Sequence, residues 1–184
     1  MPRAKLAPSL VPSKILMQFL DRVTSSYDAP ILDAPCGFGR NALALAAEGY
    51  DVIAVDKDMD RLRSVKKSAA VNLLLGSNPS GKVFSIRADL ATSRLPFGDS
   101  SFSAILCIHY PVQRIISDLD ALLKRGGHFY IETFQGHGEN HLELPDAEEI
   151  RHALSGYELL FYKERSVGPT SRNSVVVEAL AQKR

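Results

Sequence analysis

The stretch Ile31–Asn41, ILDAPCGFGRN, runs from a short apolar segment through the acid Asp33 into two glycines that flank Phe38. An apolar segment followed by glycines and then by a helical pattern is typical of a strand, a tight loop and a helix. A loop that only bound phosphates would gain nothing from a carboxylate at its mouth, because the charge would repel the ligand. Asp33 therefore indicates a ligand that carries positive charge.

The order of strand and helix repeats along the chain. Apolar runs predict strands at 29–34, 50–56, 82–89, 101–110 and 128–134, and helical patterns lie between them at about 40–48, 59–75 and 112–123. Gly49, Gly76 and the pair Gly126–Gly127 are expected to end these helices. Apolar strands that alternate with helices predict a mostly parallel sheet covered on both faces, with right-handed crossovers. We expect a doubly wound, Rossmann-like α/β fold with seven strands.

Both ends of the chain depart from this alternation. Ser13 is expected to cap one helix whose apolar stripe is formed by Ile15, Leu16, Phe19, Leu20 and Val23. Near the other end, a short helix at about 146–154 precedes two strand-like runs, 157–165 and 174–181. Their connection is too short for a crossover helix, so these strands should pair antiparallel.

We expect the chain to be a single domain over 1–184. Its parts would be a helical cap segment at 1–28, a ligand-binding core at 29–134, and a C-terminal helix with antiparallel strands at 135–184. A stretch at 135–144 would form part of a lid over the site.

Composition narrows the function classes. Lys and Arg number 22 against 21 Asp and Glu, so no net basic field attracts nucleic acid or an acidic membrane. No run approaches the roughly 18 to 20 apolar residues that span a bilayer, and the first 20 residues lack a signal-peptide core. Cys36 and Cys107 lie in a glycine loop and an apolar run, which favours reduced thiols. We expect a cytoplasmic protein without a membrane partner, and a nucleic-acid partner is disfavoured.

Three acids, Asp33, Asp56 and Asp89, follow or end expected strands. The carboxyl ends of parallel strands meet at one edge of a sheet, and ligands bind there where the strand order reverses. We therefore expect the three carboxylates to share one crevice, with Asp33 at its entrance. Asp56 follows Asp33 by 23 residues, close to the ~20-residue spacing at which an acid binds ribose hydroxyls. Gly37 and Gly39 would let an anionic ligand group approach the backbone.

Two ligands combine an adenosine ribose with an anionic group: a nicotinamide dinucleotide and S-adenosylmethionine. Aligned on Gly37 and Gly39, the dinucleotide pattern places Ala42 at its third position and is formally satisfied. The acid Asp33 suits an ammonium and a sulfonium better than a pyrophosphate, which favours S-adenosylmethionine. An NAD-dependent oxidoreductase and a catalytically silent nucleoside-binding regulatory domain remain as alternatives.

The segment 32–58, LDAPCGFGRNALALAAEGYDVIAVDKD, resembles the nucleotide-binding part of class I S-adenosylmethionine-dependent methyltransferases. The first motif of that family is commonly D-x-G-x-G-x-G, with an acid at the end of the next strand. RADLATSRLPFGDSSFSAILCIHYP at 87–111 and LLKRGGHFYIETF at 122–134 resemble the family's later strands. Within the family, the first segment is most similar to the compact tellurite-resistance-type enzymes, which act on small acceptors. Pro35 replaces the usual first glycine, and Ser103 stands where an acid is common.

The resemblance implies a role for each matching residue. Asp33 would bind the cofactor's amino group, and Asp56, beside Lys57, would bind the ribose hydroxyls. Asp89 and Leu90 would contact the adenine. The loop under the cofactor would be shaped by Pro35, Gly37 and Gly39. The transferring methyl group would be faced by Ile108, His109 and Tyr110.

Methyl transfer from a sulfonium mainly requires alignment of donor and acceptor and exclusion of water. We expect in-line transfer to a small-molecule acceptor. If the acceptor is an amine or hydroxyl that must lose a proton, His109 is the candidate base; if it is a soft anion such as a thiolate, His109 would only orient it. A histidine that merely bonds to backbone is the structural alternative, and Tyr110 would form an acceptor wall or simply pack.

The other candidates are weaker. Cys36 would be a reactive thiol or a small packing residue. Arg40 and Asn41 would bind the cofactor's carboxylate or simply begin a helix. His109 with His137 and His141 would be a metal set, but their spacing lacks a regular ligand pattern, so no metal is expected. The oligomeric state stays open.

Overall fold

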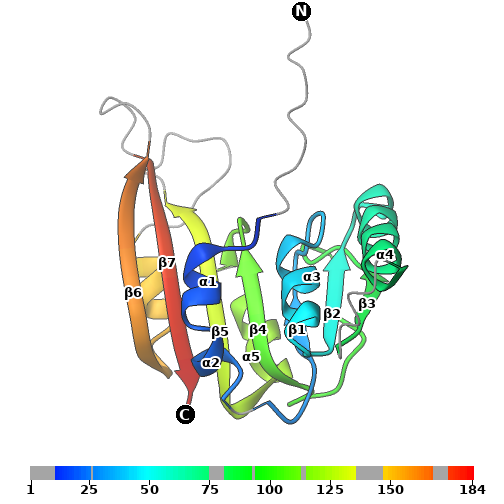
Figure 1. The fold of residues 1–184 in the computed structure, drawn as a ribbon. Helices are drawn as coiled ribbons and strands as arrows, with labels where there is room; N and C mark the ends of the chain where they lie inside the picture. Colours follow the sequence, from blue (N-terminus) through cyan, green and yellow to red (C-terminus); the bar gives the residue numbers. More distant parts are fainter. Residues whose placement is uncertain are drawn as a thin grey trace, which may run out of the picture.

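The computed structural model describes residues 11–25, 27–74, 81–92, 94–112, 115–135, 147–167 and 174–184. These residues form a seven-stranded sheet with the order β3-β2-β1-β4-β5-β7-β6 (Figure 1). The strands are β1 (Ile31–Asp33), β2 (Val52–Asp56), β3 (Val83–Arg87), β4 (Phe102–Ile108), β5 (Leu123–Gln135), β6 (Tyr157–Val167) and β7 (Ser174–Lys183). The predicted Rossmann-like fold class is confirmed.

The strands β1 to β5 are parallel to one another, and β7 is antiparallel to both β5 and β6. The expected antiparallel pairing of the last two strands is therefore confirmed. The chain proceeds from β1 outward to β2 and β3, and then returns to place β4 on the other side of β1. The strand order thus reverses between β1 and β4, where ligands bind in folds of this kind.

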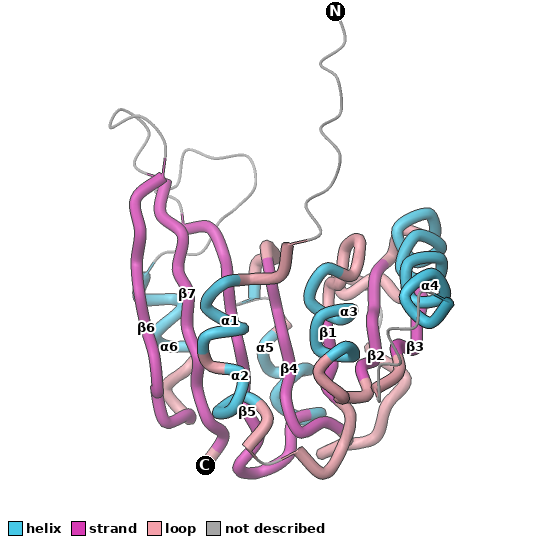
Figure 2. Tube along the Cα trace, in the orientation of Figure 1, coloured by secondary structure: helices cyan, strands magenta, loops and turns pink. Residues whose placement is uncertain are grey.

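Helices cover both faces of the sheet. Figure 2 shows α1, α2 and α3 in front of the strands, with α5 and α6 behind them. The helix bounds are α1 (Lys14–Gln18), α2 (Leu20–Val23), α3 (Arg40–Ala47), α4 (Met59–Leu74), α5 (Ile116–Leu122) and α6 (Ala147–Ala153). Among the described residues, no helix combines the length and the apolar character that crossing a bilayer requires.

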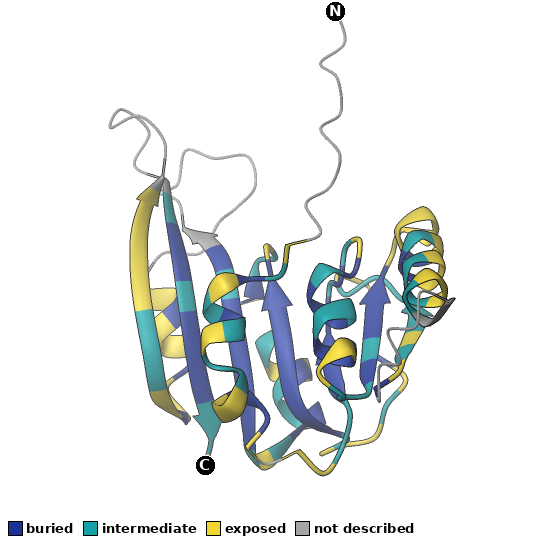
Figure 3. Ribbon diagram, in the orientation of Figure 1, coloured by how far each residue is buried: buried dark blue, intermediate teal, exposed yellow. Residues whose placement is uncertain are grey.

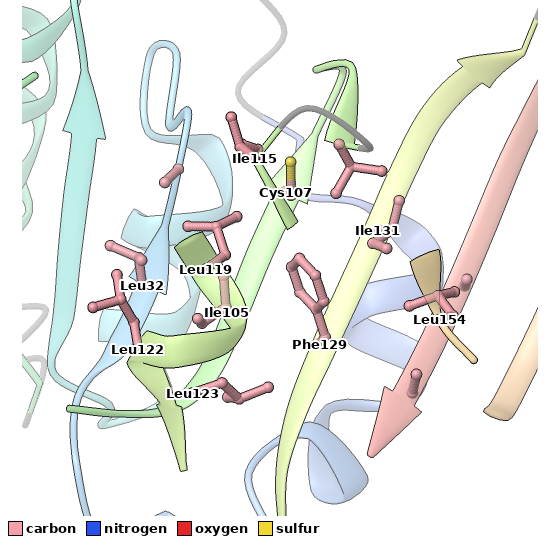
Figure 4. Packing of buried hydrophobic residues seen from close by; sticks show 14 of the residues in the cluster. Leu32, Ile105, Cys107, Ile115, Leu119, Leu122, Leu123, Phe129, Ile131 and Leu154 are labelled. Atoms are coloured by element: carbon pink, nitrogen blue, oxygen red, sulfur yellow. The ribbon is translucent and has the colours of Figure 1, made fainter. Parts of the chain in front are cut away.

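Two apolar clusters lie on opposite faces of the sheet. Every residue of β4 is buried, as expected for a strand covered on both sides. Ile105 and Phe129 join the cluster beneath α5, part of which is drawn in Figure 4, whereas Leu106 and Tyr130 join the cluster beneath α1 and α3. Figure 3 shows the central strands buried and α4 and β6 largely exposed. The buried centre holds the ends of β1 and β4 in fixed positions.

The predicted N-terminal helix is wrong in one respect, because it is two short helices. The Ser13 cap is present, since its side chain accepts a hydrogen bond from the Leu16 N–H. The helix breaks at Phe19, which has φ −106° and ψ 18°. The ring of Phe19 packs on Phe161 of β6 with the ring centroids 4.9 Å apart. This long-range packing accompanies the break and lies outside what local helix propensity can predict.

The prediction that Gly126–Gly127 ends a helix is also wrong. Helix α5 ends at Leu122, and both glycines lie within β5, where the register with β4 shifts between Phe102 and Ala104. A Cβ atom on Gly127 would lie 2.8 Å from the backbone oxygens of Lys124 and Ser103. The glycine is thus required by close backbone approach at the start of a strand.

Candidate active site

A cleft of about 220 Å³ opens at the carboxyl ends of the parallel strands. The loop from β1 to α3 forms one wall, and the end of β4 forms another, so the cleft lies at the predicted point of strand reversal. Its described lining residues are Pro35, Cys36, Gly37, Phe38, Arg40, Asn41, Asp56, Arg61, Ile108 and His109.

The two glycines of the loop are needed for different structural reasons. Both adopt left-handed conformations, with φ 57° at Gly37 and 78° at Gly39. A Cβ atom on Gly39 would lie 2.7 Å from Cγ2 of the buried Val65 in α4. A Cβ atom on Gly37 would come within 4 Å of no atom in the described part of the chain outside its two neighbours. Gly39 therefore serves helix packing, whereas Gly37 leaves space beside the cleft.

Replacing each glycine by alanine should separate these reasons. Gly37→Ala is expected to lower the free energy of unfolding by about 1 kcal/mol, the cost of the left-handed conformation. Gly39→Ala adds overpacking against Val65 and should lower it by about 2 to 4 kcal/mol. Urea denaturation measures both values. Adding Val65→Ala to the Gly39→Ala variant should remove the cost of overpacking. Equal losses of stability in the two single variants would contradict the different roles of Gly37 and Gly39.

Asp56 connects the glycine loop to the start of α4. Its side chain is 2% exposed; Oδ2 accepts from the Gly37 N–H at 2.9 Å, and Oδ1 accepts from the Asp58 N–H at 2.9 Å. Nη1 of Arg61 lies 3.6 Å from Oδ2. Each carboxylate oxygen has a further lone pair. Asp56 can therefore hold the loop and still accept hydrogen bonds from a ligand in the cleft.

Asp33 is not at the cleft entrance, and that expectation is wrong. The residue is 1% exposed, and it is absent from the described cleft lining. All three residues of β1 are buried, so the strand ends inside the core. Neither carboxylate oxygen forms a well-aligned hydrogen bond among the described residues, although the Ala42 N–H lies close enough to act on the carboxyl group. Of the three predicted acids, Asp56 alone thus belongs to the described lining of the cleft.

The charge of Asp33 nevertheless reaches the cleft. Burial raises the pKa of Asp33 to about 7; the Ala42 N–H and the Arg40 guanidinium act to lower it, and the Asp56 carboxylate acts to raise it. Arg40 and Asp56 both line the cleft. A cation bound in the cleft would therefore also interact electrostatically with Asp33.

The predicted adenine residues lie beside the described cleft rather than within its lining. Asp89 comes two residues after β3, and its Oδ1 accepts from the Ala91 N–H at 3.0 Å. Its Oδ2 lies 3.9 Å from Nζ of Lys57, the residue that follows Asp56. Leu90 lines a separate small hollow with Leu95 and residues of α5. Within the described lining of the main cleft, Lys57, Asp89 and Leu90 are all absent.

His109 and Tyr110 leave the end of β4 in different directions. His109 lines the cleft, with its side chain 46% exposed and its backbone at φ 57°. Tyr110 packs against the apolar cluster beneath α5, and its carbonyl accepts from Oγ1 of Thr133 at 3.0 Å. Tyr110 is not part of the cleft lining that the structure describes.

Sequence reasoning missed Glu132 and Arg61. Nε2 of His109 lies 3.2 Å from Oε1 of Glu132, which is the single charged residue of HFYIETF, and that charge in an apolar strand was the available signal. Arg61 lies with its Cζ 5.8 Å from the ring centroid of Phe38 and close to Asp56. No local pattern distinguishes Arg61 from the other cations of α4.

The N-terminal segment is fastened to the wall of the cleft. Asn41 accepts from the Ser13 N–H at 2.9 Å, and the Ser13 hydroxyl lies 2.8 Å from the Tyr130 hydroxyl. Asn41, in the first turn of α3, thus binds the N-terminal segment through its side chain. Burial raises the pKa of the Cys36 thiol, so its proton is retained and the reactive-thiol interpretation is disfavoured.

Two of the three histidines considered as a metal set lie outside the described residues. Among the described residues, no group of three or more His, Cys, Asp or Glu is arranged to hold a metal ion. His137 and His141, together with the stretch considered as a lid, lie outside the described residues except for Gln135.

Comparison with known proteins gives the family. The profile of the methyltransferase domain family matches residues 31–127, just over half of the chain. The chain belongs to this family, and the prediction of a class I methyltransferase is confirmed.

Two curated proteins are similar in sequence. The chain is 38% identical to the uncharacterized methyltransferase YodH of Bacillus subtilis (strain 168) over 87 residues, which are 47% of this chain and 34% of that protein. It is 30% identical to Hemagglutinin 1 of Eikenella corrodens over 138 residues, 72% of this chain and 45% of the other. The chain thus spans less than half the length of these relatives.

Solved structures share the fold. A protein of Methanosarcina mazei described as a SAM-dependent methyltransferase matches with a TM-score of 0.72 and 21% identity, covering 94% of this chain and 98% of that one. TehB from Haemophilus influenzae matches with a TM-score of 0.72 and 18% identity, covering 91% and 62%. At these identities the likeness establishes the fold.

Proposed function

We propose that the chain uses S-adenosylmethionine to methylate a small-molecule acceptor by in-line displacement. The observation that carries the proposal is Asp33, a buried carboxyl group whose oxygens form no well-aligned hydrogen bond among the described residues and whose pKa is raised to about 7, and it interacts electrostatically with Arg40 and Asp56, which line the cleft. A buried carboxylate that its neighbours compensate only in part is costly. A ligand with an ammonium and a sulfonium would offset that cost, and S-adenosylmethionine combines both with a ribose.

The residues of the cleft fit the parts of this cofactor. Asp56 would accept from the ribose hydroxyls, and the space beside Gly37 would admit the ligand close to the loop backbone. Nη2 of Arg40 is buried and has no hydrogen-bond partner within the described ranges, and it would bind the cofactor's carboxylate. Lys57, Asp89 and Leu90 would serve the adenosine end from the adjoining strand ends.

S-adenosylmethionine supplies a methyl group that is already activated on sulfur. The chain would therefore align the acceptor with that methyl group and exclude water. Ile108, buried at the end of β4, and the loop residue Pro35 would form the apolar sides of the site. His109 lies beside Ile108 in the cleft and would contact the acceptor.

The proposal is supported by family membership and by the M. mazei and TehB folds, together with the charge of the site. Two acids, Asp33 and Asp56, oppose the pyrophosphate of a nicotinamide dinucleotide. Geranyl diphosphate C-methyltransferase from Streptomyces coelicolor A3(2) shares the fold, with a TM-score of 0.67 and 15% identity, and its structure contains S-adenosyl-L-homocysteine and geranyl diphosphate.

Thermal melting tests the cofactor. S-adenosylhomocysteine at 100 times its dissociation constant should stabilise the fold by about 2.7 kcal/mol, which corresponds to about 5 to 10 °C in melting temperature for a chain of this size. NAD at the same concentration should leave the transition unchanged. A shift with NAD and none with S-adenosylhomocysteine would refute the proposal.

A further inference from the structure

Glu132 holds His109 through both its backbone and its side chain. The strands β4 and β5 pair with Ile108 opposite Glu132, one residue before His109. The His109 N–H donates to the Glu132 carbonyl at 2.6 Å, and its Nε2 lies 3.2 Å from Oε1 of Glu132. The imidazole is thus fixed at the cleft by a neighbouring strand rather than by its own loop.

The Glu132 carboxylate has a second hydrogen-bond partner besides His109. Its side chain is 13% exposed, and the Tyr130 hydroxyl donates to Oε2 at 3.5 Å while lying 2.8 Å from the Ser13 hydroxyl. Burial acts to raise the pKa of Glu132, but hydrogen bonds from His109 and Ser13 and the charges of His109 and Arg40 lower it overall. Glu132 is therefore an anion held in a fixed orientation.

His109 adopts a backbone conformation that a strand end does not require. Its φ of 57° lies in the left-handed region, which is uncommon for residues other than glycine. Such strain persists where the surroundings enforce it, and it clusters at functional sites. With Nε2–H donated to Glu132, the lone pair of the imidazole lies on Nδ1.

We propose that Glu132 is the positioning residue for His109 as a general base, so that the methyl acceptor is a compound with an O–H or N–H group. This inference rests on the proposed methyltransferase function and narrows its substrate class. A soft anion such as a thiolate has no proton to lose, and it would need no carboxylate–histidine pair. The carboxylate–histidine pair therefore favours an acceptor with an O–H or N–H group over a soft anion.

The reaction step balances without a further reagent. The acceptor's proton moves to Nδ1 of His109, and the acceptor's oxygen or nitrogen bonds to the methyl carbon of the donor. The electrons of the carbon–sulfur bond leave with sulfur, which yields S-adenosylhomocysteine. His109 then releases its proton to water.

Arg40 is the competing partner of Glu132. Its Nη2 lies 3.8 Å from Oε1, farther than Nε2 of His109 at 3.2 Å. If Glu132 served only to place Arg40, its removal would weaken cofactor binding and leave the imidazole unchanged. The other charged groups that line the described cleft are Asp56 and Arg61, and neither is changed in the test.

Nuclear magnetic resonance of the resting chain tests the positioning directly. Long-range ¹H–¹⁵N spectra at pH 8, with His109 assigned through His109→Gln, should contain a single Nε2–H tautomer. Glu132→Leu should shift these signals toward a tautomeric average, whereas Glu132→Gln should retain them, because an amide oxygen still accepts. The matched control Glu178→Gln, opposite Glu132 in β7, should change nothing. An Nδ1–H tautomer, or identical spectra in the wild type and Glu132→Leu, would overturn the proposal.

Two probe acceptors of similar size test the substrate class. Catechol carries O–H groups, and benzenethiol is a thiolate at pH 8. Methyl transfer to catechol should fall about 100-fold in His109→Gln and at least about tenfold in Glu132→Leu, while the double variant should be no slower than His109→Gln alone. Transfer to benzenethiolate should change by less than about twofold. Equal losses on both probes, or transfer to benzenethiolate alone, would overturn the proposal.

Cofactor binding separates this inference from the proposed function. S-adenosylhomocysteine should raise the melting temperature of wild type, Glu132→Gln and Glu132→Leu alike. If no variant responds, including the wild type, the proposed function fails. If all respond but the His109 tautomer does not depend on Glu132, the positioning role alone fails.

Discussion

Asp33→Asn is expected to stabilise the chain at pH 8 relative to the wild type and to weaken its affinity for S-adenosylmethionine. Burial raises the pKa of Asp33 from 3.8 to about 7. Because the folded pKa is raised, the stability contributed by the neutral form is fully present below pH 3.8 and is lost as the pH rises through 7. Asparagine cannot ionise, so the variant avoids this loss.

The pH dependence gives the size of the effect. Between pH 5 and pH 8, the wild type should lose about 2 to 3 kcal/mol of stability relative to Asp33→Asn. Urea denaturation at the two pH values measures this difference. The buried amide of the variant adds a constant cost, which cancels in the comparison.

The same substitution should reduce binding. Loss of the negative charge beneath the cleft should weaken S-adenosylhomocysteine about tenfold or more, and S-adenosylmethionine further, because the latter also carries a sulfonium. The matched control is Asp51→Asn. Asp51 directly precedes β2, whereas Asp56 of the cleft ends that strand. This variant should change affinity by less than about twofold. A stabilised Asp33→Asn chain with wild-type affinity for both ligands would show that Asp33 does not contribute to cofactor binding.

Asp56→Ala is expected to weaken cofactor binding strongly. Its two carboxylate oxygens accept from Gly37 and Asp58, and charge-assisted hydrogen bonds to a ligand contribute about 1.5 to 3 kcal/mol each. Losing two such bonds to the ribose should lower affinity at least about 100-fold. Calorimetric titration of the folded variant measures this loss.

The variant Asp58→Ala controls for damage to the start of α4. Asp58 is an exposed acid whose Oδ1 accepts from the Asp60 and Arg61 N–H groups. Its loss should reduce stability by about 1 kcal/mol, as for other helix caps, while S-adenosylhomocysteine still binds. Comparable loss of affinity in both variants would show that the helix start, rather than the Asp56 carboxylate, is needed for binding.

The sequence allowed much of the fold to be predicted because the signals are local. Apolar runs and glycines mark β1, α3 and β2, and the acid Asp56 marks a strand end in the cleft. The bend at Phe19 and the placement of Gly126 inside β5 were not predictable, since each accompanies contacts with segments distant in the chain.

The site was harder to predict than the fold. Asp33 lies at the end of the expected strand, but its burial depends on how the whole sheet packs around the short β1. The pairing of His109 with Glu132 spans 23 residues, and the contact of Ser13 with Tyr130 spans 117. Such contacts arise from strand order, which a single sequence predicts only in outline.

The central claim is tested most directly by titrating S-adenosylhomocysteine into the wild-type chain in a calorimeter. The account predicts saturable binding at one site per chain, with affinity that falls as the pH drops below 7, where Asp33 becomes neutral. The absence of binding at pH 8, or tighter binding of NAD than of S-adenosylhomocysteine, would contradict it.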